Sequence, residues 1–290
     1  MVNKIILGTV QFGLKYGINN FSEQMTQRDV FQILNIAKAN KINTLDTAAA
    51  YGLSELRIGK YIKKNKEDPN FIVITKFDLK ARLSPIESLD QSLLNLNLNS
   101  VEMIMFHNYD DFKTLSKSDL NELLKLKGSK FQKLGISLYK NEEVELVLNL
   151  DLFDVVQIPF NCLDNANHRG ETLRRLKSKN IETHTRSVFL QGLFFMDRNK
   201  IESKLMPLRK YLYFFDEVAN NYKIEKGVLA LQYVLSKTYI DRVLIGVDSI
   251  HQINQNISMI ETELPSCIFE EIDKIFVNEI NLLNPAMWSK

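Results

Sequence analysis

The stretch Ile42–Gly59, with the sequence INTLDTAAAYGLSELRIG, decides the fold that we expect for this chain. It begins with an apolar run that predicts a buried strand, and this strand ends on Asp46. A turn of small residues leads to Tyr51, and Ser54 is the expected cap of an amphipathic helix. A carboxylate at the end of a buried strand, followed by a phenol, is typical of active sites at the C-terminal ends of barrel strands. Either residue alone could equally have a purely structural role.

Apolar runs alternate with helical periods eight times along the chain. The predicted strands are nearly continuous apolar segments, as in a parallel sheet with both faces covered, and no GxGxxG turn follows any of them. We therefore predict an α/β fold, a (β/α)8 TIM barrel that forms a single domain over residues 1–290 with an extra C-terminal helix and a tail. The expected strands are residues 5–10, 42–48, 71–77, 101–107, 131–137, 154–160, 181–188 and 242–247.

Capping signals mark the starts of several predicted helices. Thr26 and Ser84 each begin a capping box, and Asn141 and Ser249 are the expected caps of two later helices. The extra C-terminal helix is expected over residues 266–282. The remaining helices are expected at residues 54–64, 120–126 and 171–179, with two more within 207–237.

Composition excludes several classes of protein. The formal net charge is +2, so we expect no nucleic-acid partner, and no apolar run is long enough to span a bilayer. The N-terminus lacks the pattern of a signal peptide. Cys162 and Cys267 lie far apart without a CxxC motif, which predicts buried, reduced thiols in a cytoplasmic protein. The four histidines do not pair at metal-ligand spacing, so no metal site is expected.

The segment DTAAAYG, followed by SE and then IG, resembles the signature of the aldo-keto reductase family. In that family the Asp and the Tyr belong to a catalytic tetrad, which a Lys and a His at the ends of the next two strands complete. The matching residues here are Asp46, Tyr51, Lys76 and His107. The resemblance extends from LGT near the start of the chain to NPAMW near residue 288.

The resemblance implies an NAD(P)H-dependent oxidoreductase that reduces an aldehyde, ketone or sugar carbonyl to an alcohol. Tyr51 would donate the proton, and Lys76 is expected to lower the pKa of this phenol from its usual value near 10. Asp46 would keep Lys76 charged and in place. His107 would orient the carbonyl oxygen with a hydrogen bond.

The family binds its nicotinamide dinucleotide across the strand C-termini without a glycine-rich turn. The positions that resemble its cofactor contacts are Thr9, Asp46, Ser137, Gln157, Arg186, Ser187, Leu190, Gly192, Gly246, Gln252 and Asn256. Many members place an aromatic ring under the nicotinamide where this chain has Arg186. Members that prefer NADP(H) often carry a Lys and an Arg at the positions of Gly246 and Gln252. NADP(H) is therefore the family default here, and NAD(H) stays open.

Leu190 and Gly192, in the segment after the seventh strand, would supply backbone N–H donors to the cofactor. Lys41 stands where the family commonly has Gly, so we expect the preceding Asn40 to take the left-handed conformation that ends the helix. Trp288 could fold over the mouth of the barrel or pack against its side.

Two other functions remain open from the sequence. The chain could be a cofactor-sensing regulatory subunit on the same fold. It could also be a barrel lyase that uses Lys76 to form a Schiff base. The expected partner is a small-molecule carbonyl substrate, and the protein is expected to be a monomer or a weak oligomer.

Overall fold

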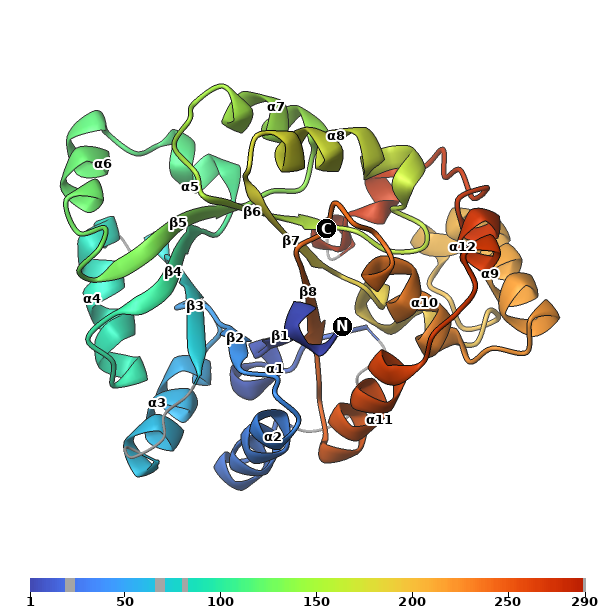
Figure 1. The fold of residues 1–290 in the computed structure, drawn as a ribbon, viewed down its shortest axis with the longest axis horizontal. Coiled ribbons are helices and arrows are strands. Elements are labelled where there is room, and N and C mark those ends of the chain that lie inside the picture. Colours follow the sequence, from blue (N-terminus) through green and yellow to red (C-terminus); the bar gives the residue numbers. More distant parts are fainter. Residues whose placement is uncertain (19–23, 66–70, 80–82, 289–290) are drawn as a thin grey trace.

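The computed structural model describes residues 1–18, 24–65, 71–79 and 83–288. Eight parallel strands close into a barrel in sequence order, and β8 pairs with β1 to complete it (Figure 1). The predicted α/β barrel is therefore confirmed. The strands are β1 (Ile5–Gly8), β2 (Thr44–Asp46), β3 (Ile72–Lys76), β4 (Val101–Phe106), β5 (Phe131–Ser137), β6 (Val155–Pro159), β7 (Glu182–Arg186) and β8 (Arg242–Gly246).

Helices surround the barrel (Figure 1). In the described ranges, none of them is long and apolar enough to cross a membrane. The α-helices are α1 (Val10–Gly13), α2 (Gln27–Ala39), α3 (Ser54–Lys64), α4 (Pro85–Leu96), α5 (Tyr109–Lys113), α6 (Lys117–Leu124), α7 (Asn141–Leu148), α8 (Ala166–Ser178), α9 (Arg209–Asn221), α10 (Lys226–Leu235), α11 (Ile250–Glu261) and α12 (Ser266–Ile272). The 3-10 helices are η1 (Val2–Lys4), η3 (Leu190–Phe195), η4 (Ser203–Leu208), η5 (Ile280–Leu283) and η6 (Pro285–Met287).

Apolar side chains fill the interior of the barrel. A compact cluster of buried strand residues forms this inner core, separate from the larger core between the strands and the helices. Because the interior is packed, a ligand can enter only from an end of the barrel. The inner cluster consists of Ile6, Ile74, Met103, Met105 and Val155.

Several predicted helix starts are confirmed. The Thr26 hydroxyl accepts a hydrogen bond from the backbone N–H of Asp29, and the Asp29 carboxylate accepts one from Thr26 in return. Ser84 forms the same kind of capping box at α4, and Ser249 caps α11. These caps are local in sequence, so the pattern alone identifies them.

Two predicted caps are wrong because their side chains have distant partners. Ser54 is the first residue of α3, but its hydroxyl donates to the carbonyl oxygen of Thr9 at 2.9 Å. Asn141 begins α7, and its side-chain oxygen accepts from the Arg169 guanidinium at 2.8 Å. Both side chains join separate segments of the barrel instead of capping a helix.

Some predicted boundaries are also wrong. Val10 belongs to α1 and not to the first strand, because the chain leaves β1 after Gly8. The helix predicted over 266–282 ends at Ile272, where the buried amide of Asn165 donates to the carbonyl oxygens of Ile272 and Ile275 at 3.1 and 2.8 Å. Most strands are shorter than predicted at their C-terminal ends, where the chain turns into the loops of the site.

The two free cysteines lie in different environments. Cys162 is fully buried, and burial raises the pKa of its thiol well above the usual value. Cys267, on α12, is exposed, so the prediction that both thiols are buried is wrong for this residue.

Replacing Lys41 by glycine is expected to raise the free energy of unfolding by about 0.5–1 kcal/mol. Lys41 has a φ of +60°, whereas Asn40 has a φ of −101°, so the prediction that Asn40 is left-handed is wrong. A side chain at a left-handed position costs free energy that glycine avoids. Urea unfolding would measure the change. The matched control is Lys60→Gly inside α3, which should lose about 1 kcal/mol. A Lys41→Gly variant that is no more stable than the parent would contradict this account.

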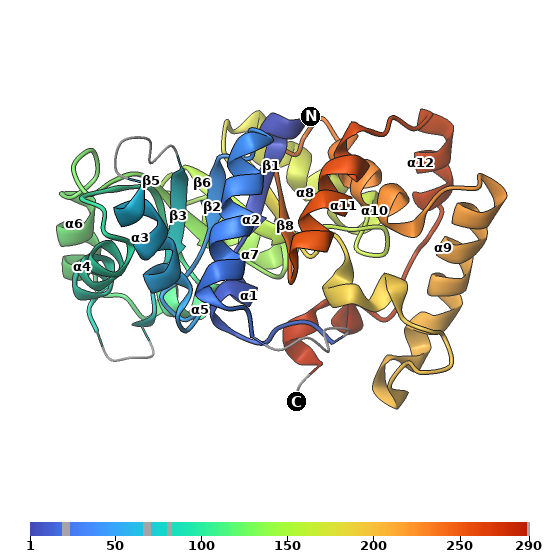
Figure 2. The same ribbon diagram turned by 90° about the horizontal axis from the view of Figure 1, so that it is seen from below.

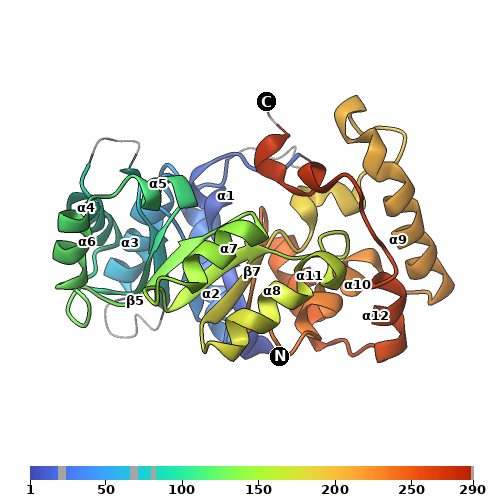
Figure 3. The same ribbon diagram turned by 90° about the horizontal axis from the view of Figure 1, so that it is seen from above.

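The N-terminal η1 and the C-terminal η6 lie at opposite ends of the barrel (Figures 2 and 3). The N-terminal η1 packs against the start of β8, where Arg242 reaches the carbonyl oxygen of Asn3. The C-terminal tail crosses the opposite end, to which the C-termini of all the strands point (Figure 2). The tail therefore lies at the end of the barrel where the candidate site is found.

Candidate active site

The structure brings the four predicted catalytic residues to one cavity of about 680 Å³ at the C-terminal ends of the strands. Asp46 is the last residue of β2, and Lys76 is the last residue of β3. His107 directly follows β4, and Tyr51 lies in the loop between β2 and α3. Parallel neighbouring strands thus deliver the four side chains to the same end of the barrel.

A buried ion pair joins Asp46 to Lys76, and both residues are almost inaccessible to solvent. The Lys76 ammonium also donates to the carbonyl oxygen of Thr47 at 3.0 Å. The side-chain amide of Gln157 donates to the second carboxylate oxygen of Asp46 at 2.8 Å. Burial lowers the pKa of Lys76, and the Asp46 carboxylate opposes this effect. The carboxylate is therefore fixed from two sides and supports the charge of the lysine.

The Tyr51 ring contacts both Lys76 and His107. The Lys76 Nζ lies 5.3 Å from the centre of this ring, and the His107 ring meets it edge to face at 5.7 Å between centres. Burial, followed by the nearby Asp46 carboxylate, raises the pKa of the Tyr51 phenol well above 10. The expected lowering of this pKa is therefore not found in the folded protein, because burial and the Asp46 carboxylate dominate. Tyr51 is thus a protonated phenol at neutral pH.

Two glycines fix the turn that carries Tyr51. Gly52 has a φ of +56°, a conformation that favours glycine. A Cβ on Gly13 would lie only 1.7 Å from the Tyr51 carbonyl oxygen, so the end of α1 touches this turn backbone to backbone. The close contact holds the phenol over the strand ends.

Thr9 does not line the cavity, although the sequence suggests it as a cofactor contact. It is fully buried, and both its N–H and its hydroxyl donate to the carbonyl oxygen of Asp46, at 3.0 and 2.9 Å. The hydroxyl of Ser54 donates to Thr9 in turn, and the hydroxyl of Thr47 donates to Ser54. Thr9 therefore positions the backbone of the catalytic strand end.

Most of the other predicted cofactor residues line the cavity. Leu190 is an exception: it is fully buried behind the cavity wall, and its N–H donates to the carbonyl oxygen of Ser187. The N–H of Gly192 likewise donates to Phe189, so the backbone donors that we predicted at these two positions are already used within the turn. The predicted cofactor residues that do line the cavity are Asp46, Ser137, Gln157, Arg186, Ser187, Gly192, Gly246, Gln252 and Asn256.

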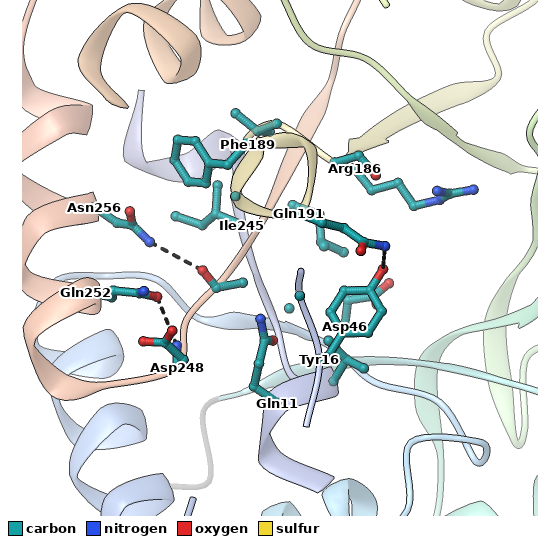
Figure 4. A pocket seen from close by; sticks show the side chains of 18 of the residues that line it. Gln11, Tyr16, Asp46, Arg186, Phe189, Gln191, Ile245, Asp248, Gln252 and Asn256 are labelled. Atoms are coloured by element: carbon teal, nitrogen blue, oxygen red, sulfur yellow. Dashed lines mark hydrogen bonds between the residues drawn. The ribbon is translucent and has the colours of Figure 1, made fainter. Parts of the chain in front are cut away.

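Arg186 occupies one side of the cavity, across from Gln252 and Asn256 (Figure 4). Its guanidinium lies over the ring of Tyr139, with 4.1 Å between the central carbon and the ring centre. One of its N–H groups donates to the carbonyl oxygen of Leu138 at 3.1 Å. The position that is aromatic in many family members is thus taken by a cation stacked on a tyrosine.

The far end of the cavity is built from the loop after β8 and from α11 (Figure 4). The side-chain oxygen of Gln252 accepts from the backbone N–H of Asp248 at 3.0 Å, and the Asn256 amide lies 3.5 Å from the Gly246 carbonyl oxygen. Lys226 also lines this end, but its ammonium pairs with Asp216 at 2.7 Å. We did not identify Asp248 or Lys226 from the sequence.

Gln11, on α1, is a further lining residue that we did not identify from the sequence, because it lies beyond the strand predicted over residues 5–10 and no motif marks it. Its amide lies against Gly246, where a Cβ would come within 3.0 Å of it (Figure 4). The side-chain oxygen of Gln11 is buried and has no hydrogen-bond partner among the described residues. Buried polar atoms are normally paired, so a polar ligand such as a dinucleotide fits this part of the cavity.

Comparisons with known proteins agree with this geometry. The chain is 29% identical to the L-galactose dehydrogenase of Arabidopsis thaliana, in a match that covers 78% of this chain and 75% of that protein. Two solved structures from Pseudomonas aeruginosa, provisionally described as aldo-keto reductases, share the fold with TM-scores of 0.64 and 0.63. They are 18% and 17% identical, and each match covers 88% of both chains. The model of the aldo/keto reductase family matches residues 4–276, so this protein is an oxidoreductase that belongs to that family.

Proposed function

We propose that this protein reduces a small aldehyde, ketone or sugar carbonyl to an alcohol with NAD(P)H, and that Tyr51 is the proton donor. The observation that carries this proposal is the contact of a protonated phenol with the buried Asp46–Lys76 pair and with His107 at one cavity. When bound, the nicotinamide supplies the hydride to the carbonyl carbon, which no side chain can do.

Each of the four residues has its own role in the protonation of the carbonyl oxygen. Tyr51 passes its phenolic proton to this oxygen as the C–O double bond becomes single, which leaves a phenolate to be protonated again from solvent. The ammonium of Lys76 stabilises that phenolate, and Asp46 keeps the ammonium charged. His107 lies edge to face with Tyr51 and can donate a hydrogen bond to the same oxygen.

The contacts of Lys76 argue against the Schiff-base alternative. A lysine nucleophile needs a neutral amine that is open to the substrate. Lys76 is instead held by Asp46 and by the carbonyl oxygen of Thr47. A cofactor-sensing subunit would use the same cavity without turnover, so an assay on a broad panel of carbonyl compounds separates it from a reductase. The name of the Arabidopsis relative supports including sugars in this panel, tested in both directions.

For the cofactor, we propose NAD(H), although NADP(H) is the family default. Two carboxylates, Asp248 and Glu225, line the cavity, and Asp248 lies beside Gln252, where the adenosine end is expected. The nearby Lys226 is already paired with Asp216. A carboxylate can accept a hydrogen bond from a ribose 2′-hydroxyl but repels a 2′-phosphate.

The cofactor proposal predicts that the wild type binds NADH at least about tenfold more tightly than NADPH, and that Asp248→Arg reverses this order. Fluorescence titration with each cofactor would measure both dissociation constants. Glu217→Arg, on the exposed face of α9, makes the same kind of charge change away from the cavity and should leave the ratio unchanged. Tighter binding of NADPH by the wild type would contradict the proposed preference. If neither cofactor binds, the reductase proposal itself fails.

A further inference from the structure

A second cavity, of about 390 Å³, lies beside the active site and shares part of its wall. Its other walls come from η4 and from the C-terminal tail, so residues far apart in the sequence enclose it. The residues that line both cavities are Tyr16, Tyr139, Arg186, Ser187 and Gln191. A molecule whose carbonyl lies at Tyr51 could therefore extend past Arg186 into the second cavity.

Fixed side chains shape the wall between the cavities and the outer wall. The Gln191 amide donates to the Tyr16 hydroxyl at 2.9 Å and so connects the loops that follow β1 and β7 (Figure 4). On the outer wall, Trp288 is almost fully buried, and its indole N–H donates to the carbonyl oxygen of Leu282 at 2.9 Å. Trp288 thus does not pack on the side of the barrel but closes the second cavity from the tail.

The charges around this junction do not cancel. Lys204 pairs with Glu202 at 3.3 Å on the outer wall, and Lys76 pairs with Asp46 in the active site. Arg186 has no carboxylate within ion-pair distance among the residues that the structure describes. The guanidinium stacks one face on the Tyr139 ring, and one of its five N–H groups donates to the carbonyl oxygen of Leu138. One positive charge with open donors therefore remains where the cavities meet.

We propose that the second cavity is a substrate subsite and that Arg186 binds an anionic oxygen group of the substrate, a carboxylate or a phosphate. The substrate class is then an acidic carbonyl compound, such as a sugar acid or a sugar phosphate. A guanidinium fixed on an aromatic ring presents planar paired donors that match the oxygens of either group. This inference rests on the proposed carbonyl reduction, because it places the substrate carbonyl at Tyr51.

The test compares aldehydes that differ in charge. The probes are 3- and 4-carboxybenzaldehyde and 4-formylphenyl phosphate, each set against the neutral methyl 4-formylbenzoate. The wild type should favour at least one anionic probe by about tenfold or more in kcat/KM, and Arg186→Met should abolish that preference. Arg186→Lys, which keeps the charge but loses the planar fork, should retain part of it. The carboxylate and phosphate probes show which group the subsite accepts.

A matched control and a binding measurement make the result decisive. Arg175→Met, on the outer face of α8, removes an arginine that pairs with Glu145 at the surface and should leave the preference intact. Equal losses for anionic and neutral probes in Arg186→Met, together with weaker NADH binding, would identify Arg186 as a cofactor contact and overturn the proposal. A wild-type enzyme with equal kcat/KM for the anionic and the neutral probes would also overturn the proposal.

Calorimetry with 4-(hydroxymethyl)benzoate and its methyl ester separates this proposal from the proposed function. Binding of the carboxylate that depends on Arg186, without turnover of any aldehyde, would support the anion subsite and refute the reductase. Turnover of aldehydes without any preference for the anionic probes would support the reductase and refute the anion subsite.

Discussion

Tyr51→Phe is expected to lower kcat for carbonyl reduction by about a hundredfold to ten-thousandfold, with the cofactor dissociation constant unchanged. The substitution removes the phenolic proton but keeps the ring that meets His107 edge to face. The turn that carries residue 51 depends on Gly13 and Gly52, so it should keep its shape. Single-turnover kinetics with preloaded cofactor would measure the loss in the chemical step, and fluorescence titration would show that binding survives.

The control for this variant is Tyr213→Phe on α9, an exposed tyrosine whose hydroxyl contacts Arg209 and not the cavity. It should leave kcat unchanged. The raised pKa of Tyr51 adds a second expectation: the phenol stays protonated up to about pH 10, so wild-type kcat should show no loss from tyrosine ionisation near neutral pH. Tyr51→Phe activity within a few-fold of the wild type would refute the proton-donor role.

The barrel, and the convergence of the four candidate catalytic residues on one cavity, could be predicted because the signals are local. Each strand is a short apolar run, and Asp46 and Lys76 stand at the points where two of these runs end. The buried face of α2 follows the same rule: the helical period predicted its members, and the structure buries them all. They are Val30, Ile33, Leu34 and Ala37.

The rest of the site depends on contacts between distant segments. The hydroxyl of Ser54 is satisfied by Thr9, which lies 45 positions earlier, so a helix-capping pattern misassigns it. The pKa of Tyr51 depends on the burial of its ring and on how closely Asp46 approaches it, which sequence order does not specify. The second cavity exists only because the tail returns over the strand ends. A short stretch of sequence contains neither the contact between Ser54 and Thr9 nor the second cavity, because each one joins residues that are far apart along the chain.

Asp46→Asn is expected to lower the free energy of unfolding at neutral pH by about 3–5 kcal/mol. The change leaves the Lys76 ammonium almost fully buried without its ionic partner. The double variant Asp46→Asn/Lys76→Met removes both charges and should therefore be more stable than the single variant. Urea unfolding of the wild type and of the three variants, including Lys76→Met, would give the coupling energy between the two residues. A double variant no more stable than Asp46→Asn would contradict the role of the unpaired charge.

The pH dependence of these variants gives an independent test of the same ion pair. Burial lowers the pKa of Lys76 below its ordinary value of 10.5, and Asp46 limits that decrease. Asp46→Asn removes the carboxylate that opposes the effect of burial. In this variant Lys76 therefore loses its proton at a lower pH in the folded state than in the unfolded chain. In the window between the two pKa values the unfolded state binds more protons, and stability rises with pH. Asp46→Asn should therefore regain part of its lost stability between neutral pH and about pH 10, whereas the double variant should not. If the free energy of unfolding changes with pH in the same way for Asp46→Asn and for the double variant, the buried Lys76 does not carry the charge that the proposed mechanism needs.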